Sequence, residues 1–162
     1  MAANKEELMK LAQRAVIQGY SAKLPMMMVK AVVDKFGKKG WAVLQKAAEQ
    51  FGRERAQILK EALEIDINDA SSLGKVFDFE DGLSGVRGEW VESSPNRAKK
   101  LETKCVPFNV YKDFPPYCEK LLYWIARATI KELNPNAELE DFAKAKCMAH
   151  GDDVCELTIE LK

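Results

Sequence analysis

Two cysteines near the end of the chain, with the only histidine between them, are the residues whose spacing first suggests chemistry. The stretch CMAHGDDVC runs from Cys147 to Cys155 and contains His150. Three interpretations are open for the pair: two small core residues, half of a metal site, or part of a thiol active site.

Strand geometry predicts where the two thiols lie. We expect a hairpin over residues 143–161 with its turn at 151–153. A three-residue turn places Cys147 diagonally from Cys155 on one face, with Cα atoms about 7–8 Å apart. A turn of two or four residues would place them on opposite faces. With the three-residue turn, His150 points away from both cysteines and is a surface residue.

Cys118 is the best-placed nucleophile of the four cysteines by local physics. We expect it in the first turn of a helix opened by Pro115 and Pro116, where free N–H groups and the helix dipole lower the pKa of a thiol. The alternative is a small packed side chain. Glu119 could serve in acid–base chemistry or balance the dipole. Cys105 ends the preceding strand, close enough along the chain for the two thiols to meet.

The four cysteines together could instead bind zinc tetrahedrally. The ligands would be Cys105, Cys118, Cys147 and Cys155. None of their separations matches the usual C-x2-C spacing, so spacing alone supports zinc weakly. A full four-cysteine shell would make zinc structural, whereas three ligands and a water would leave an open catalytic position.

The elements that must position these residues change in character halfway along the chain. Apolar spacing predicts helices over residues 6–19, 26–36, 40–51 with a continuation to 63, and 71–80. Alternation predicts strands over 86–93, 97–106, 143–150 and 154–161, with a long apolar helix between Pro115 and Asn134. The fold class is therefore α+β: a helical N-terminal half, then an antiparallel sheet with a long central helix and a C-terminal β-hairpin.

Length and composition bound the remaining possibilities. With 162 residues we expect a single domain, with a helical subregion at 1–81 and an α+β subregion at 86–162 that carries every cysteine. Lys+Arg and Asp+Glu are both 25, so nothing favours a nucleic-acid partner. The start is polar and no apolar run nears the roughly 18 residues of a membrane span, which predicts a cytoplasmic protein with no membrane partner.

Three interpretations are open for the Met26–Met28 run: it fills gaps in a core, it lies at a subunit contact, or it lines a ligand site.

Motifs in the second half resemble a known family. These are Thr103–Phe108, Tyr117–Glu119, Leu133–Pro135, and Cys147 with the following Gly-Asp-x-x-Cys-Glu-Leu ending at Leu157. The chain resembles the L-2-amino-thiazoline-4-carboxylic acid hydrolase-like family. The resemblance spans nearly the whole chain and is specific in the last sixty residues or so. It implies hydrolysis of a small cyclic C–N bond.

The closing half is also similar to the 4-vinyl-reductase-type small-molecule-binding domain. That resemblance implies zinc bound by a C-x7-C pair on the terminal hairpin, with a further cysteine and an acidic residue. Cys147 and Cys155 match the pair and Cys118 the further cysteine. Lys144 and Lys146 occupy the place of the acidic ligand, so Cys105 replaces it, Asp141 reaches in, or the site is metal-free.

Three functions compete. The first is a hydrolase using Cys118, Cys105 and Glu119, with Asp152 as another acid–base candidate. The second is a binding or sensor module for a hydrocarbon or aromatic ligand. Its pocket would be walled by Trp90, Phe108, Tyr111, Tyr123 and Trp124. The third is an assembly protein that forms a homodimer through its N-terminal helices.

Overall fold

The computed structural model describes residues 5–162. The first four residues belong to the polar start that argues against a secretory signal, and they lie outside the described residues. The helical half comprises α1 (Lys5–Val16), the π-helix η1 (Ile17–Lys23), α2 (Leu24–Phe36), α3 (Lys38–Ala62), α4 (Ala70–Leu73) and α5 (Lys75–Ser84). The second half comprises β1 (Arg87–Ser93), β2 (Arg97–Lys104), α6 (Phe108–Tyr111), the π-helix η2 (Tyr117–Leu122), α7 (Tyr123–Leu133), β3 (Ala137–Leu139), the 3-10 helix η3 (Met148–His150) and β4 (Cys155–Leu161).

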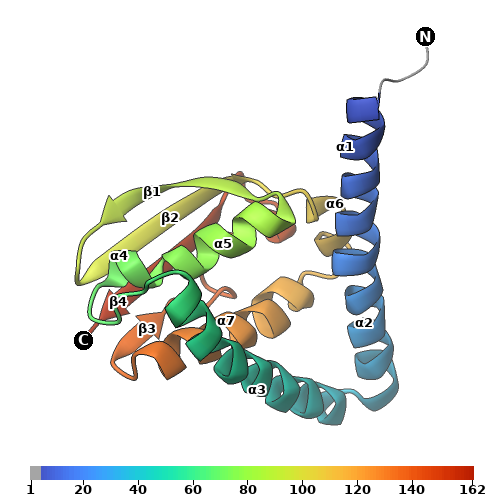
Figure 1. Cartoon of the computed structure of the whole chain (residues 1–162). Coiled ribbons are helices and arrows are strands. Elements are labelled where there is room, and N and C mark those ends of the chain that lie inside the picture. Colours follow the sequence, from blue (N-terminus) through green and yellow to red (C-terminus); the bar gives the residue numbers. More distant parts are fainter. Residues whose placement is uncertain (1–4) are drawn as a thin grey trace.

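The strands form one antiparallel sheet in the order β1-β2-β4-β3 (Figure 1). The α+β class is confirmed, including the antiparallel pair of strands that ends the chain. Because β4 lies between β2 and β3, its inward side chains are buried, and Leu157 and Ile159 are 4% and 0% exposed.

The first strand of that closing pair is not where the sequence predicts it. It is β3, and residues 143–150 instead form turns and η3. Gly151 has a φ of 99°, which folds the segment back instead of continuing a ladder. Glu156 N–H still bonds Lys146 O at 2.8 Å, so this loop runs beside the start of β4.

The inner face of the sheet carries a buried charge cluster as well as apolar side chains. Lys100 is 2% exposed, and its Nζ lies 2.6 Å from Asp78 and 2.5 Å from Asp81. Trp90 donates from Nε1 to Asp78 at 3.0 Å. A buried cation needs such partners, so this cluster holds α5 against the sheet.

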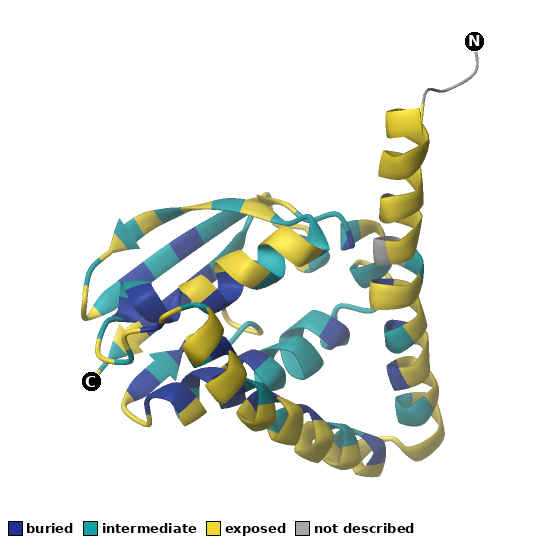
Figure 2. Cartoon of the chain, viewed as in Figure 1, coloured by how far each residue is buried: buried dark blue, intermediate teal, exposed yellow. Residues whose placement is uncertain are grey.

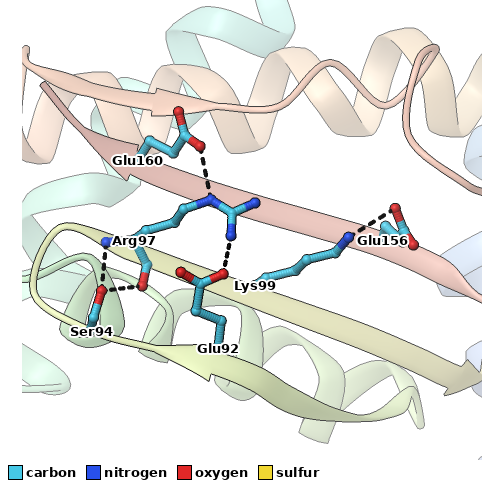
Figure 3. Close-up of polar contacts among 6 residues, drawn as sticks. All are labelled: Glu92, Ser94, Arg97, Lys99, Glu156 and Glu160. Atoms are coloured by element: carbon cyan, nitrogen blue, oxygen red, sulfur yellow. Dashed lines mark hydrogen bonds and ion pairs between the residues drawn. The ribbon is translucent and has the colours of Figure 1, made fainter.

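The outer face of the sheet is polar and its charges pair across strands (Figure 3). Arg97 bonds both Glu92 on β1 and Glu160 on β4, the latter at 2.9 Å. Lys99 pairs with Glu156 at 3.2 Å. These pairs reinforce a register that the buried inner face already specifies.

The helices α1, η1 and α2 form a long arm along one side of the molecule (Figure 1). Among the arm side chains that the structure describes, Ala22, Met26 and Val29 are buried, and the last two pack in a second core with Tyr117. The upper part of the arm is exposed (Figure 2), including the apolar stripe of the first predicted helix. Across the described residues we find no helix long and apolar enough to span a membrane.

Gly52 sets the closest approach between helices. This glycine does not interrupt the helix, because α3 continues through it and has 25 residues in all. A Cβ at this position would lie 2.4 Å from Ile125 O and 2.8 Å from Ala128 Cβ, both on α7. Thr129 Oγ1 also donates to Gly52 O at 3.1 Å, so the two backbones are in near contact.

We predict that Gly52→Ala lowers the free energy of unfolding by roughly 1–3 kcal/mol, because α7 must shift to admit the methyl group. Urea denaturation measures this. The control is Gly82→Ala on α5, where the added Cβ meets nothing within 4 Å and alanine favours the helix by up to about 1 kcal/mol. Equal effects of the two substitutions would contradict the close approach.

Candidate functional site

A cavity of about 420 Å³ lies between the inner face of the sheet and the helices. Its apolar wall consists of Phe51, Phe77, Leu83, Val86, Pro107, Tyr111, Tyr117, Leu122, Ile125, Ala126, Phe142 and Leu157. Its charged lining residues are Arg55, Glu80, Asp81, Glu102, Lys146 and Glu156. All four cysteines line it too. The site is thus an apolar chamber with polar groups and thiols in its wall.

The four cysteines come from separate parts of the fold. Cys105 directly follows β2, Cys118 lies in η2, Cys147 precedes η3 and Cys155 begins β4. The Cys155 thiol donates to Cys147 Sγ at 3.9 Å, and Cys118 also hydrogen-bonds Cys147. The two cysteines of the opening stretch therefore meet, as the sequence predicts, although the loop and not a hairpin register brings them together.

The hydrogen bonds of this cluster favour negative charge on Cys147. Hydrogen bonds from Cys118 and then from Cys155 hold the pKa of Cys147 far below its usual value. The two donors are affected in the opposite sense: hydrogen bonding to Cys147, followed by burial, raises the pKa of Cys118 and of Cys155. Burial raises the pKa of Cys105 to about 12.

The lowered pKa that the sequence predicts for Cys118 is therefore wrong. The prediction relied on free amides in a first helical turn, but Cys118 N–H bonds Pro115 O at 3.0 Å. Its thiol is also buried against other sulfur atoms, where it acts as a hydrogen-bond donor.

Glu102 is a cavity residue that sequence reasoning missed. It lies directly opposite Cys155 in the β2–β4 register. Burial, and next the nearby Asp81 carboxylate, raise the pKa of Glu102 to about 8. At neutral pH this carboxyl is mostly protonated and can donate a proton or a hydrogen bond.

Two ion pairs accompany Glu102 in the cavity wall. Arg55 of α3 bonds Glu80 of α5, and its Nε donates to Thr129 Oγ1 at 2.8 Å. Asp81 bonds Lys100. Burial raises the pKa of both Glu80 and Asp81. The strand alternation places Lys100 and Glu102 on one face, but it could not show that this charged face is the inner one.

The aromatic residues that we expected around a pocket mostly lie elsewhere. Of that set, Tyr111 lines the cavity. Trp90 bonds Asp78 in the charge cluster, and Phe108 lies beneath the Lys112 ammonium. Tyr123 packs on Phe142 with ring centroids 5.4 Å apart, and Trp124 meets Trp41 edge-on at 5.8 Å.

Glu119 and His150 form a separate pair outside the cavity lining. His150 Nε2 lies 2.5 Å from Glu119 Oε1. His150 is exposed, as the sequence predicts, but it lies on a folded-back loop beside Glu119 of η2 and not on a hairpin. Asp152 accepts from Cys147 N–H at 2.8 Å and Asp141 from Ala143 N–H at 3.1 Å, so both shape turns.

The residues fit a zinc ion only in part. A tetrahedral Zn–S bond of about 2.3 Å implies sulfur atoms roughly 3.8 Å apart, close to the 3.9 Å between Cys147 and Cys155. Within residues 5–162, however, no group of three or more His, Cys, Asp or Glu side chains is arranged to hold a metal ion. As they lie, Cys118, Cys147 and Cys155 form a hydrogen-bonded thiol cluster, and zinc stays a prediction.

Comparison with known proteins identifies the fold alone. No protein-family model matches the chain, and no curated protein matches it. The chain is similar in structure to a trafficking protein particle complex subunit 3 from Naegleria fowleri, described as covalently bound to palmitic acid. The TM-score is 0.61 with 15% sequence identity, over 94% of this chain and 96% of that one. The resemblance to the hydrolase-like family stays a prediction.

Cys147 is 7% exposed, so iodoacetamide must reach it through the cavity that it lines. We predict that it is the first cysteine to be alkylated, and that it still reacts at pH 6, where an ordinary thiol is protonated. Peptide mapping by mass spectrometry after timed labelling measures this. Metal content is determined on the same preparation, purified without a histidine tag.

Two variants make the labelling decisive. Cys147→Ser should abolish the fast phase, whereas Cys105→Ser should leave it unchanged. Labelling of Cys118 first would contradict the assignment of the thiolate. One zinc per chain, together with slow labelling of every cysteine, would show that the cysteines form a metal site and not a hydrogen-bonded thiol cluster.

We also predict that the protein loses stability between about pH 4.5 and pH 8 through Glu102. Its pKa is raised in the folded state, so folding favours the protonated carboxyl, and this stabilisation is lost as the pH rises through about 8. Glu102→Gln should flatten the pH dependence and raise the free energy of unfolding at pH 8 by up to ~3 kcal/mol. Urea denaturation at pH 5 and pH 8 tests this; the exposed Glu89→Gln is the control. An unchanged profile in Glu102→Gln would refute it.

Proposed function

We propose that this chain is a small-molecule-binding module whose ligand occupies the cavity between sheet and helices. The cavity carries the proposal. Its volume of about 420 Å³, its aromatic and aliphatic wall and its few charged groups are typical of sites that bind small organic molecules.

The ligand we propose is a hydrocarbon or aromatic molecule. Phe51, Tyr117 and Phe142 supply aromatic surface, while Glu102 and the thiols offer polar contacts. The structural neighbour is described as bound to palmitic acid. A shared fold does not transfer a ligand, but it makes a long acyl chain a useful probe beside aromatic compounds.

A hydrolase acting on a small cyclic C–N bond is the second candidate. The Cys147 thiolate and the protonated Glu102 carboxyl both line the cavity, and they interact electrostatically. The thiolate would form a C–S bond to the ring carbon while Glu102 passes its proton to the departing nitrogen. Water would then attack the same carbon, give a proton to the Glu102 carboxylate and release Cys147 as the thiolate. Turnover that Cys147→Ser abolishes would favour this candidate over reversible binding.

The proposal places the protein in the cytoplasm, where unpaired thiols stay reduced, and treats it as a homodimer. Zinc is part of the proposal through the resemblance to the 4-vinyl-reductase-type domain. The Cys147–Cys155 spacing supports it, and metal analysis decides it.

We predict that partly filling the cavity weakens binding. Ala126 lines the cavity and is 4% exposed, so Ala126→Leu should lower affinity for palmitic acid or an aromatic fluorophore at least roughly tenfold. Fluorescence titration measures this. The matched control is Ala47→Leu on the exposed side of α3, which should bind like the wild type. Saturable binding by the wild type that Ala126→Leu leaves intact would place the ligand elsewhere, and no binding of any probe would count against the module.

A further inference from the structure

Cys147 and Cys155 lie opposite each other where the loop before η3 runs beside the start of β4. The N–H of Glu156 donates to the carbonyl of Lys146 at 2.8 Å, and the two cysteines are the next pair toward the turn. Cys147 has an extended backbone, and Cys155 is the first residue of β4. In antiparallel chains, a pair next to such a bonded pair has Cα atoms about 4.5 Å apart, within the range of about 4.4–6.8 Å that a disulfide spans. The backbone thus has the pairing that a disulfide between them requires.

The two sulfur atoms are already in contact. The Cys155 thiol donates to Cys147 Sγ at 3.9 Å, and Met148 N–H donates to Cys155 Sγ at 3.3 Å, which holds that sulfur beside the loop. An S–S bond is about 2.0 Å long, so the sulfur atoms must approach each other by roughly 2 Å. Rotation about the Cα–Cβ bonds supplies such a displacement, and the backbone need not change.

Cys118 is the competing partner for Cys147. It also donates a hydrogen bond to Cys147, but it does so from the helix η2. That helix contacts the loop through side chains, such as Glu119 with His150. A backbone hydrogen bond holds the loop to β4 beside Cys155, so the geometry favours Cys155 as the partner.

A small reagent reaches both thiols through the cavity, because both line it. All four cysteines of the chain are free. Cys147 accepts hydrogen bonds from Cys118 and Cys155, which favours negative charge on its sulfur and makes it the attacking atom. In a reducing compartment, a disulfide between such thiols is usually transient and serves catalysis or redox sensing.

We propose that Cys147 and Cys155 form a redox-active pair, which a hydroperoxide oxidises to a disulfide. The Cys147 sulfur attacks the terminal oxygen of the hydroperoxide and the O–O bond breaks, which leaves a sulfenic acid on Cys147. The departing oxygen takes a proton from water, so an organic hydroperoxide becomes an alcohol and hydrogen peroxide becomes water. The Cys155 sulfur then attacks the sulfenic sulfur, the S–S bond forms, and the hydroxyl group leaves with the Cys155 proton as water. The two cysteines lose two electrons and the hydroperoxide gains them.

The inference concerns the thiols of the cavity wall and holds whichever ligand the cavity binds. A dithiol reductant breaks the disulfide and restores both thiols, so the pair can cycle. While oxidised, Cys147 cannot act as a nucleophile. Oxidation would therefore stop the hydrolysis that forms the second candidate function.

Peptide mapping of the full-length protein after brief exposure to hydrogen peroxide tests the proposal. The protein is first reduced and its metal content measured, and the thiols left after the exposure are blocked with N-ethylmaleimide. Trypsin cleaves after Lys146, so residues 147–162 form one peptide with both cysteines of the pair, whereas the other two cysteines lie on separate peptides. We expect this peptide to have lost two hydrogen atoms, to carry no maleimide, and to regain both thiols in dithiothreitol.

Three variants separate the steps. Cys155→Ser should stop at the sulfenic acid, which dimedone traps on Cys147. Cys147→Ser should form no disulfide. Cys105→Ser is the matched control and should form the disulfide as the wild type does. Circular dichroism confirms that each variant folds.

A disulfide that joins residues 147–162 to the peptide of Cys118 would overturn the assigned partner. Oxidation of Cys147 beyond the sulfenic acid with no disulfide, or no disulfide in excess peroxide, would overturn the redox pair. One zinc per chain that protects both thiols from peroxide would overturn it too, since the two sulfur atoms would then be metal ligands.

Discussion

The near contact of α3 and α7 at Gly52 is the constraint on which the rest of the structure depends. With no side chain at this position, Thr129 reaches the backbone of α3 and at the same time accepts a hydrogen bond from Arg55. This bond orients Arg55 toward Glu80, and the ion pair between them joins α3 and α7 to α5. One glycine thus sets the distance between layers and the position of a charge in the cavity wall.

Buried charge is what gives the cavity its chemistry. Lys100 neutralises two aspartates, and Arg55 neutralises Glu80, but Glu102 lies among them without a dedicated cation. Its proton is retained because an ionised carboxylate there would be both desolvated and repelled. Cys147 is the favoured site of negative charge nearby for the complementary reason, since the Cys118 and Cys155 thiols donate hydrogen bonds to it. A proton donor and a nucleophilic sulfur therefore share one apolar chamber.

Local signals predicted much of the fold. Helical spacing identified α1, α2 and α3, and alternation identified β1, β2 and β4. Asp69 caps α4, because its side chain accepts hydrogen bonds from Ser71 N–H and Ser72 N–H. The strand β3 was missed because it has only three residues, too few to show a period. The segment before Gly151 alternates like a strand, but the left-handed glycine and the bonds around Cys147 hold it in a compact loop.

The sequence by itself determined the α+β class and the order of the main elements, because these follow from periodicity along the chain. Only the tertiary structure decided that a folded-back loop brings Cys147 to Cys155, which thiol is favoured as the thiolate, that Glu102 lines the cavity, and that Trp90 and Trp124 do not. Those properties depend on burial and on charges contributed by residues far apart in the sequence. A pKa or a cavity wall is set by the surroundings of a side chain, and these exist only once the layers have packed.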